Sequence, residues 1–145
     1  MPPEDAYLVL FRRIPVLATL LDQEGCFIDV SDAWVRRTGY TRDALRGARP
    51  EDIATEHSAR RIREELRPCF RRTGRLDNVP VEFRTTDGST LELLVTSTAE
   101  FDAGGLFLHS LSVFTELSDG ARLERRYRGL YHATPAMLHT IDSVP

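Results

Sequence analysis

Residues 79–95, "VPVEFRTTDGSTLELLV", alternate apolar and polar side chains on either side of a turn signal. Successive side chains of a β-strand point to opposite faces, so every second residue shares a face. Asp87 and Gly88 favour a tight turn between the two halves. The stretch therefore predicts a β-hairpin with one buried face, which carries Val79, Val81, Phe83, Leu91, Leu93 and Val95.

The segments around this hairpin predict more strands of the same sheet. Apolar runs of strand length occupy 16–21 and 26–30, joined by a glycine-containing turn at 22–25. After a turn at 102–105, residues 106–117 predict a last strand. Two strands, a helical region and three further strands are typical of an α+β fold, with one antiparallel sheet and the helices segregated on one side.

The region between the second and third strands carries helix signals. Ser31 and Thr41 are residue types that cap helix N-termini, and they precede predicted helices over 32–38 and 42–46. Several short helices are therefore expected to follow the first hairpin.

The longest predicted helix runs over 55–72, and Pro50 suits the first turn of a short helix before it. Pro68 lies inside the long helix. Because proline has no backbone N–H and its ring clashes with the carbonyl four residues earlier, a bend is predicted near residues 64–66.

The residues near both ends of the chain predict elements outside the main domain. Apolar residues at helical spacing near the N-terminus predict an amphipathic helix that ends before Pro15. The segments "LATLLDQEG" and "AMLHTIDSV" are similar, which suggests a second, truncated copy of the fold at the end of the chain. The predicted division is a flanking helix over 1–15, a domain over 16–118, a linker helix over 119–134 and the start of the second copy over 135–145.

Composition narrows the classes of function. Hydrophobic residues make up 41% and charged residues 28% of the chain, and the net charge is −3. Nucleic-acid binding relies on clustered cations, so we expect no nucleic-acid partner. With no apolar run long enough to span a bilayer and no signal peptide, we expect a cytoplasmic location without direct membrane contact. Cys26 and Cys69 are expected to be free thiols.

The stretch 22–47, "DQEGCFIDVSDAWVRRTGYTRDALRG", resembles a PAS domain. It matches the family pattern of Asp-x-x-Gly, a strand, an Asn or Ser, an aromatic helix, Thr-Gly-Tyr and Leu-x-Gly. The similarity continues through 66–102 and reaches Glu116-Leu117-Ser118, which stands where the family has Asp-Ile-Thr. It covers 16–118, and "YRGLYHATPAMLHTID" resembles the start of a second PAS repeat.

The resemblance implies a specific fold and role. PAS domains have a five-stranded antiparallel sheet in the order 2-1-5-4-3, short helices on one face, and flanking N- and C-terminal helices. They act as sensory and dimerisation modules of bacterial histidine kinases and diguanylate cyclases, with the output domain in the same chain. Glu116 and Ser118, at the junction after the last strand, are the implied signal-relay residues.

A curved sheet packed against short helices can enclose a ligand cavity. The alternative is that the same side chains simply fill the core. The pocket candidates from the helices, the inner strand face and the cap are Ser31, Trp34, Tyr40, Ile53, Ile62, Leu66, Phe70, Val81, Phe83, Leu93, Val95, Ser97, Ser110 and Ser112.

The resemblance also allows cofactors to be tested residue by residue. Pro50 stands where light-oxygen-voltage members carry their reactive cysteine, and Cys69 lies in a helix instead. Arg63 stands where haem-binding members carry their axial histidine, and His57 lies near the helix start. Haem and flavin are therefore not expected, and neither is a metal. We expect no cofactor, or an unknown small molecule.

The outward face of the predicted sheet is apolar, and a second subunit or the N-terminal helix is expected to cover it. A homodimer follows as the expected state. The predicted interface residues are Tyr7, Leu10, Phe11 and Ile14 on the helix, with Leu94, Phe107, His109, Leu111 and Val113 on the sheet.

Three functions remain to be compared. The first is a sensory and dimerisation module, and the second is a protein-interaction module with a filled core and no ligand. The third is a small enzyme, which needs a polar dyad facing the cavity. The inward positions offer only serines as polar groups, so we expect no enzymatic activity.

Overall fold

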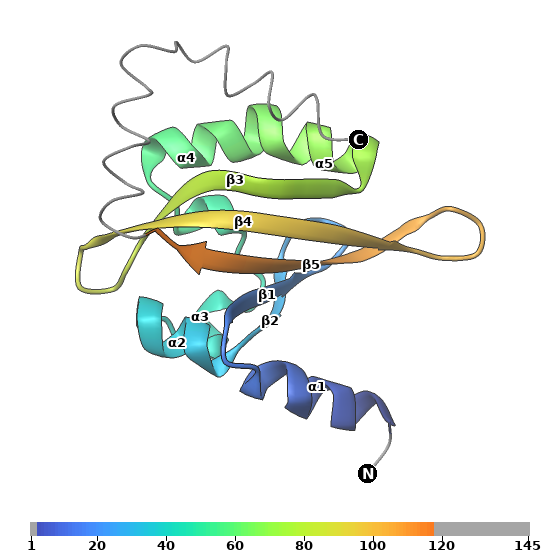
Figure 1. The fold of residues 1–145 in the computed structure, drawn as a ribbon, viewed down its shortest axis with the longest axis horizontal. Coiled ribbons are helices and arrows are strands. Elements are labelled where there is room, and N and C mark those ends of the chain that lie inside the picture. Colours follow the sequence, from blue (N-terminus) through green and yellow to red (C-terminus); the bar gives the residue numbers. More distant parts are fainter. Residues whose placement is uncertain (1–2, 118–145) are drawn as a thin grey trace.

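The computed structural model describes residues 3–117 of the chain. Five strands form one antiparallel sheet in the order β2-β1-β5-β4-β3 (Figure 1). The predicted strand order is confirmed. The strands are β1 (Leu17–Leu21), β2 (Phe27–Val30), β3 (Arg75–Arg84), β4 (Thr90–Phe101) and β5 (Phe107–Glu116).

The alternating stretch of residues 79–95 forms the β3–β4 hairpin. Val81 pairs with Leu93, and both side chains are buried on the inner face of the sheet. In the turn, the Asp87 carboxylate accepts hydrogen bonds from the Thr85 hydroxyl and, at 2.9 Å, from the Ser89 backbone N–H. The side chain of Asp87 thus satisfies backbone and hydroxyl donors that the turn would otherwise leave unpaired.

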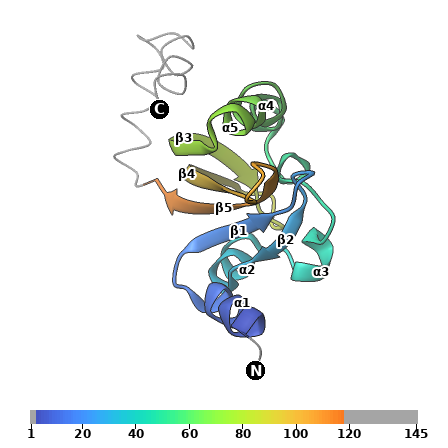
Figure 2. The same ribbon diagram turned by 90° about the vertical axis from the view of Figure 1, so that its right-hand side faces the viewer.

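The helices between β2 and β3 pack on one face of the sheet (Figure 2). Ser31 and Thr41 cap the first two, because their side-chain oxygens accept hydrogen bonds from the backbone N–H groups of Trp34 and Ala44. The helical elements are α2 (Asp32–Thr38), α3 (Arg42–Leu45), the 3-10 turn η1 (Pro50–Asp52), α4 (Glu56–Arg61), the π-helical turn η2 (Ile62–Leu66) and α5 (Arg67–Thr73).

The predicted long helix is divided at its proline. Residues 56–73 are helical throughout, but the backbone widens into the π-helical turn η2, which ends at Leu66, two positions before Pro68. The prediction placed a bend near residues 64–66, and the irregularity lies there. A π turn moves the carbonyls away from the proline ring and tolerates the missing N–H.

The core lies between the inner sheet face and these helices. Trp34 on α2 is fully buried at its centre. Its ring centroid is 4.8 Å from that of Phe114 on β5 and 5.4 Å from that of Phe83 on β3. Aromatic packing therefore joins α2 to the centre and to one edge of the sheet.

The N-terminal helix α1 (Pro3–Arg13) contacts α2 and β2 (Figure 1). Arg12 holds it there through an ion pair of 2.8 Å with Asp29, whose side chain is buried. Within one chain, this helix therefore does not cover the outward face of β4 and β5, and covering by a second subunit stays a prediction. Tyr7 and Leu10 remain 71% and 63% exposed on α1.

Two predictions fall on residues 118–145, outside the described part of the chain. These are the linker helix over 119–134 and the second copy over 135–145, and Ser118 lies there as well. Within residues 3–117, the helices are too short or too polar to cross a membrane.

Candidate ligand cavity

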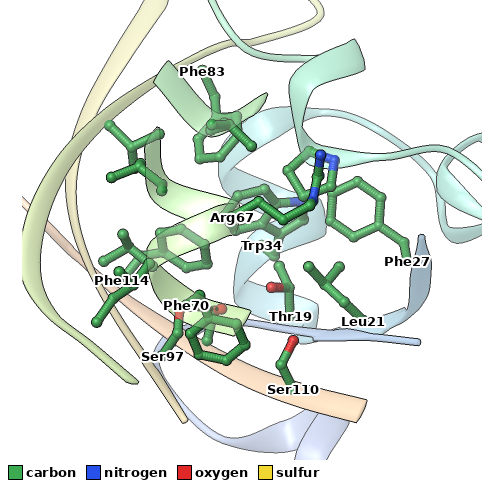
Figure 3. A pocket seen from close by; sticks show the side chains of 17 residues that line it. Thr19, Leu21, Phe27, Trp34, Arg67, Phe70, Phe83, Ser97, Ser110 and Phe114 are labelled. Carbon is green, nitrogen blue, oxygen red and sulfur yellow. Dashed lines mark hydrogen bonds between the residues drawn. The ribbon is translucent and has the colours of Figure 1, made fainter. Parts of the chain in front are cut away.

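A cavity of about 100 Å³ lies between the inner face of the sheet and the helices (Figure 3). Every strand contributes to its wall, as do α2, η1, η2 and α5. The lining side chains are Thr19, Leu21, Phe27, Trp34, Pro50, Ile62, Leu66, Arg67, Phe70, Leu76, Val81, Phe83, Val95, Ser97, Ser110, Ser112 and Phe114.

Most of the predicted pocket candidates lie in this wall. The strand residues share one face through the pairing of Ser97 with Ser112 and of Val95 with Phe114. Those in the wall are Trp34, Ile62, Leu66, Phe70, Val81, Phe83, Val95, Ser97, Ser110 and Ser112.

Four predicted candidates lie elsewhere. Ser31 is committed to structure, because its hydroxyl caps α2, accepts from the backbone N–H of Ala18 and donates to the carbonyl of Val16. The hydroxyl of Tyr40 donates to a backbone carbonyl at 2.9 Å. Ile53 and Leu93 are buried in the core away from the cavity.

Several lining residues were missed. Thr19 and Leu21 on β1 face the cavity because they pair with Ser112 and Ser110, whose side chains also face it. The alternation along β5 had already placed Ser110 and Ser112 on the inner face of the sheet. Pairing β1 with β5 would have placed Thr19 and Leu21 on the same face. Phe27, Pro50, Arg67, Leu76 and Phe114 complete this set.

The polar part of the wall consists of hydroxyl groups and one indole. The hydroxyls of Ser97 and Ser112 lie 2.6 Å apart and hydrogen-bond to each other. Thr19 and Ser110 add two more buried hydroxyls from β1 and β5. The Nε1–H of Trp34 is buried and has no hydrogen-bond partner among the described residues.

One charged side chain reaches the cavity. Arg67 on α5 donates two hydrogen bonds to Glu51 on η1, at 2.6 and 2.8 Å. Burial is the largest single influence and favours the neutral form of Glu51, but the hydrogen bonds from Arg67 and from the backbone, together with the charges of Arg67 and Arg49, outweigh it and lower the pKa of this carboxyl. The cation at the wall is thus neutralised by a bidentate partner.

The outward sheet face carries an apolar patch, which we call the outer patch (Leu94, Leu111 and Val113). These residues alternate along β4 and β5 with side chains that line the cavity. Leu111 and Val113 are each 36% exposed. Leu94, Leu111 and Val113 therefore lie on the outward face of the sheet, as the alternation of the sequence predicted. His109, also on β5, is half-buried.

Phe107 was predicted on the outward face, and that is wrong. Its ring packs edge-on against Phe70 of α5, with centroids 6.2 Å apart, and under the guanidinium of Arg71 at 5.9 Å. The register of β4 and β5 shifts between Glu100 and Phe101. Such a bulge reverses the alternation of side chains, and so turns Phe107 toward α5.

The end of the last strand is tied to α2. Glu116 accepts hydrogen bonds from both Nε and Nη2 of Arg37, the latter at 2.5 Å. The hydrogen bond from Arg37 to Glu116 raises the pKa of the guanidinium. The backbone N–H of Leu117 also donates to the carbonyl of Glu92 on β4. Because Arg37 and Trp34 share α2, the ion pair links the cavity wall to the end of β5.

The positions that correspond to cofactor-binding residues in other PAS domains differ in their location. Pro50 is in the cavity wall, whereas Arg63 and His57 are exposed. The lining residues include no histidine, cysteine or methionine that could bind haem iron. Residues 3–117 contain no group of three or more side chains that could hold a metal ion.

Comparison with known proteins agrees with this architecture. A family model described as "PAS domain" matches residues 15–119. The chain belongs to the PAS domain family. A comparison with curated protein sequences gives no match.

Solved PAS domains share the fold at low sequence identity. A PAS domain from Colwellia psychrerythraea is 12% identical, with a TM-score of 0.69, over 80% of this chain and 98% of that one. A PAS domain from a two-component sensor histidine kinase is 18% identical, with a TM-score of 0.64, over 79% and 96%. A light-oxygen-voltage domain studied with a flavin analogue is 17% identical, with a TM-score of 0.68, over 88% and 93%.

Proposed function

We propose that this PAS domain is the sensory module of a bacterial signalling protein, of the histidine kinase or diguanylate cyclase type. In this proposal the output domain follows in the same polypeptide. The observation that carries it is the connection of the cavity to the end of β5. Trp34 borders the cavity, and Arg37 on the same short helix binds Glu116 at the exit of the sheet.

Signal transfer then requires two arrangements of the exit segment. A ligand that packs against Trp34 changes the position of α2, and a shift of α2 strengthens or weakens the Arg37–Glu116 pair. A ligand can only shift the equilibrium by its difference in affinity for the two arrangements. The ion pair is partly exposed, so its own contribution is about 1 kcal/mol or less.

We propose that the module works as a homodimer. Tyr7 and Leu10 are exposed on α1, which packs beside α2 and β2, and the outer patch on β4 and β5 is partly exposed. A second subunit could bury both surfaces. Apolar surface of this kind is otherwise unfavourable in water.

The proposal includes neither haem, nor flavin photochemistry, nor catalysis. Cofactor pockets typically measure about 300–1,000 Å³, well above the roughly 100 Å³ found here. Pro50 has no nucleophilic sulfur to bond to a flavin. Among the described residues that line the cavity, Arg67 alone is charged, and it is paired with Glu51. The hydroxyls of Ser97 and Ser112 bond to each other and not to a base that could activate them.

The small cavity favours one alternative function. A PAS domain with an almost filled core could act as a protein-interaction module that binds no ligand. In that case its partner would bind the outer patch or α1, and small molecules would have no effect on the output.

A charge-swap experiment tests the sensory proposal in the signalling protein that carries this domain. Arg37→Glu and Glu116→Arg each replace the ion pair by a like-charge pair and should change the output activity by up to about fivefold. The double variant restores opposite charges and should return the activity toward that of the original protein. Arg46→Glu is the matched control, because Arg46 is exposed, pairs with Asp43 rather than with β5, and follows α3, which contacts β2. Unchanged activity in both single variants would refute the relay.

A further inference from the structure

The indole of Trp34 carries the strongest unexplained feature of the cavity. Its side chain is fully buried, it lines the cavity, and its Nε1–H has no partner within residues 3–117 (Figure 3). Buried donors in native proteins nearly always have a hydrogen-bond partner. The Nε1–H is therefore available to an acceptor that the described protein atoms do not supply.

Hydroxyl groups form another polar region of the wall. Ser97 and Ser112 bond to each other, whereas the hydroxyls of Thr19 and Ser110 have no side-chain hydrogen bond within the described part of the chain. Both residues are nearly fully buried. Since a hydroxyl both donates and accepts, this region can satisfy either kind of polar group on a ligand.

The rest of the cavity wall favours a ligand with a small apolar part. Most other lining side chains are aliphatic or aromatic. The volume of about 100 Å³ is smaller than the roughly 150 Å³ of an apolar cavity that binds benzene. A ligand held entirely within this volume is thus no larger than benzene.

The charges at the wall select against an anion. Arg67 already binds Glu51 in a bidentate pair, and the side chain of Glu51 is only 7% exposed. A ligand carboxylate would approach a cation that is already neutralised and would be repelled by Glu51. Burying an unpaired charge is unfavourable, so a neutral molecule is preferred.

We propose that the cavity binds a small neutral organic molecule whose carbonyl-type oxygen accepts a hydrogen bond from Trp34 Nε1–H. Its apolar part packs against the aliphatic and aromatic wall, and the Thr19 and Ser110 hydroxyls bind any second polar group. This inference rests on the proposed sensory function, in which the molecule is the signal.

The test uses the indole N–H of Trp34 as a direct reporter. The chain has one tryptophan, so a ¹H–¹⁵N correlation spectrum contains a single indole signal. The 145-residue chain is titrated separately with 2-butanone, propionamide and propionate, which have the same number of non-hydrogen atoms. The two neutral carbonyl compounds should shift the indole proton downfield in a saturable manner. Propionate should bind at least about tenfold more weakly, a difference of about 1.4 kcal/mol.

A cavity-filling variant locates the site. Ser110→Val removes an unpaired hydroxyl and fills part of the cavity with a side chain that suits a strand. It should abolish the saturable shift. Thr98→Val on β4 is the matched control, because Thr98 is exposed and does not line the cavity, and it should leave the titration unchanged. Circular dichroism confirms that both variants fold.

Three results would overturn the proposal. The first is an indole signal that neither neutral probe shifts, which would mean that water alone satisfies the Nε1–H. The second is equal affinity for propionate, and the third is unchanged binding by a folded Ser110→Val variant. These outcomes concern the ligand alone, whereas the Arg37 and Glu116 charge swap tests signal transfer without a ligand, so a failure of one proposal can be distinguished from a failure of the other.

Discussion

Two hairpins of the sheet, β1–β2 and β3–β4, are stabilised by different interactions. The β3–β4 hairpin is long, and its inner face consists of apolar side chains that are buried against the helices. The β1–β2 hairpin is short and contains a buried carboxylate, Asp29, which binds Arg12 of α1 and Arg42 of α3. Burial of apolar area stabilises the first, whereas the second also depends on charged groups contributed by other elements.

This difference separates a rigid part of the domain from an adjustable one. Apolar packing is non-directional and tolerates few rearrangements without loss of stability. Ion pairs are directional and can exchange partners, and Asp29 connects the hairpin to the N-terminal flanking helix. We therefore expect the β3–β4 hairpin to set the stability of the domain and the β1–β2 hairpin to set the position of α1.

The largest effect is expected from Leu93→Ala at the centre of the β3–β4 hairpin. Leu93 is fully buried, and its truncation removes apolar contacts and leaves a cavity. The free energy of unfolding should fall by about 3 kcal/mol, measured by urea denaturation. Leu106→Ala is the control, because Leu106 is 62% exposed, and it should cost less than about 0.5 kcal/mol. Equal effects of the two variants would contradict the role of this hairpin.

A smaller but more local effect is expected from Asp29→Asn in the β1–β2 hairpin. The change leaves Arg12 and Arg42 without their shared carboxylate. Because both arginines are partly exposed, we expect a loss of about 2 kcal/mol, below the value for a fully buried pair. Hydrogen exchange should increase mainly in α1. Asp43→Asn, at a highly exposed ion pair, should leave exchange in α1 unchanged. Uniformly faster exchange in Asp29→Asn would remove the distinction between the hairpins.

The smallest effect is expected from acid titration of the β3–β4 turn. Hydrogen bonds from Thr85 and Ser89 lower the pKa of Asp87 from 3.8 to about 2. The folded form binds the ionised carboxylate, so this stabilisation is complete above pH 3.8 and disappears as the pH falls toward 2. Asp87→Asn should flatten this part of the stability curve. Nuclear magnetic resonance titration of the Asp87 carboxyl measures the pKa directly, and a normal value would refute the account of the turn.

The strand residues of the cavity were accessible to prediction because their environment is periodic. Alternation along β4 and β5 placed Ser97, Ser110 and Ser112 on the inner side, and the cavity lies there. The same rule failed at Phe107, because a register shift interrupts the alternation and leaves no clear trace in the residue types. Periodicity is thus informative only as far as the pairing remains regular.

Other misassignments arose from hydrogen bonds and from side-chain length. Ser31 and Tyr40 were plausible pocket residues by position, but each binds backbone groups that need a partner. Arg67 was missed because a charged residue at a helix position is normally read as solvent-exposed. Its long side chain instead reaches η1, where Glu51 pairs with it at the cavity wall.

The strand order was implied by the resemblance to PAS domains. The sequence by itself determined the positions of the strands, the inner face of the long strands, the helix caps and the irregularity before Pro68. These properties depend on neighbours along the chain or on a repeating pattern. Only the tertiary structure decided which inner side chains border a cavity, that the Trp34 Nε1–H lacks a partner, and that α1 lies beside β2. Those properties depend on how distant segments fill space together, and the volume left between them is not encoded in any single segment.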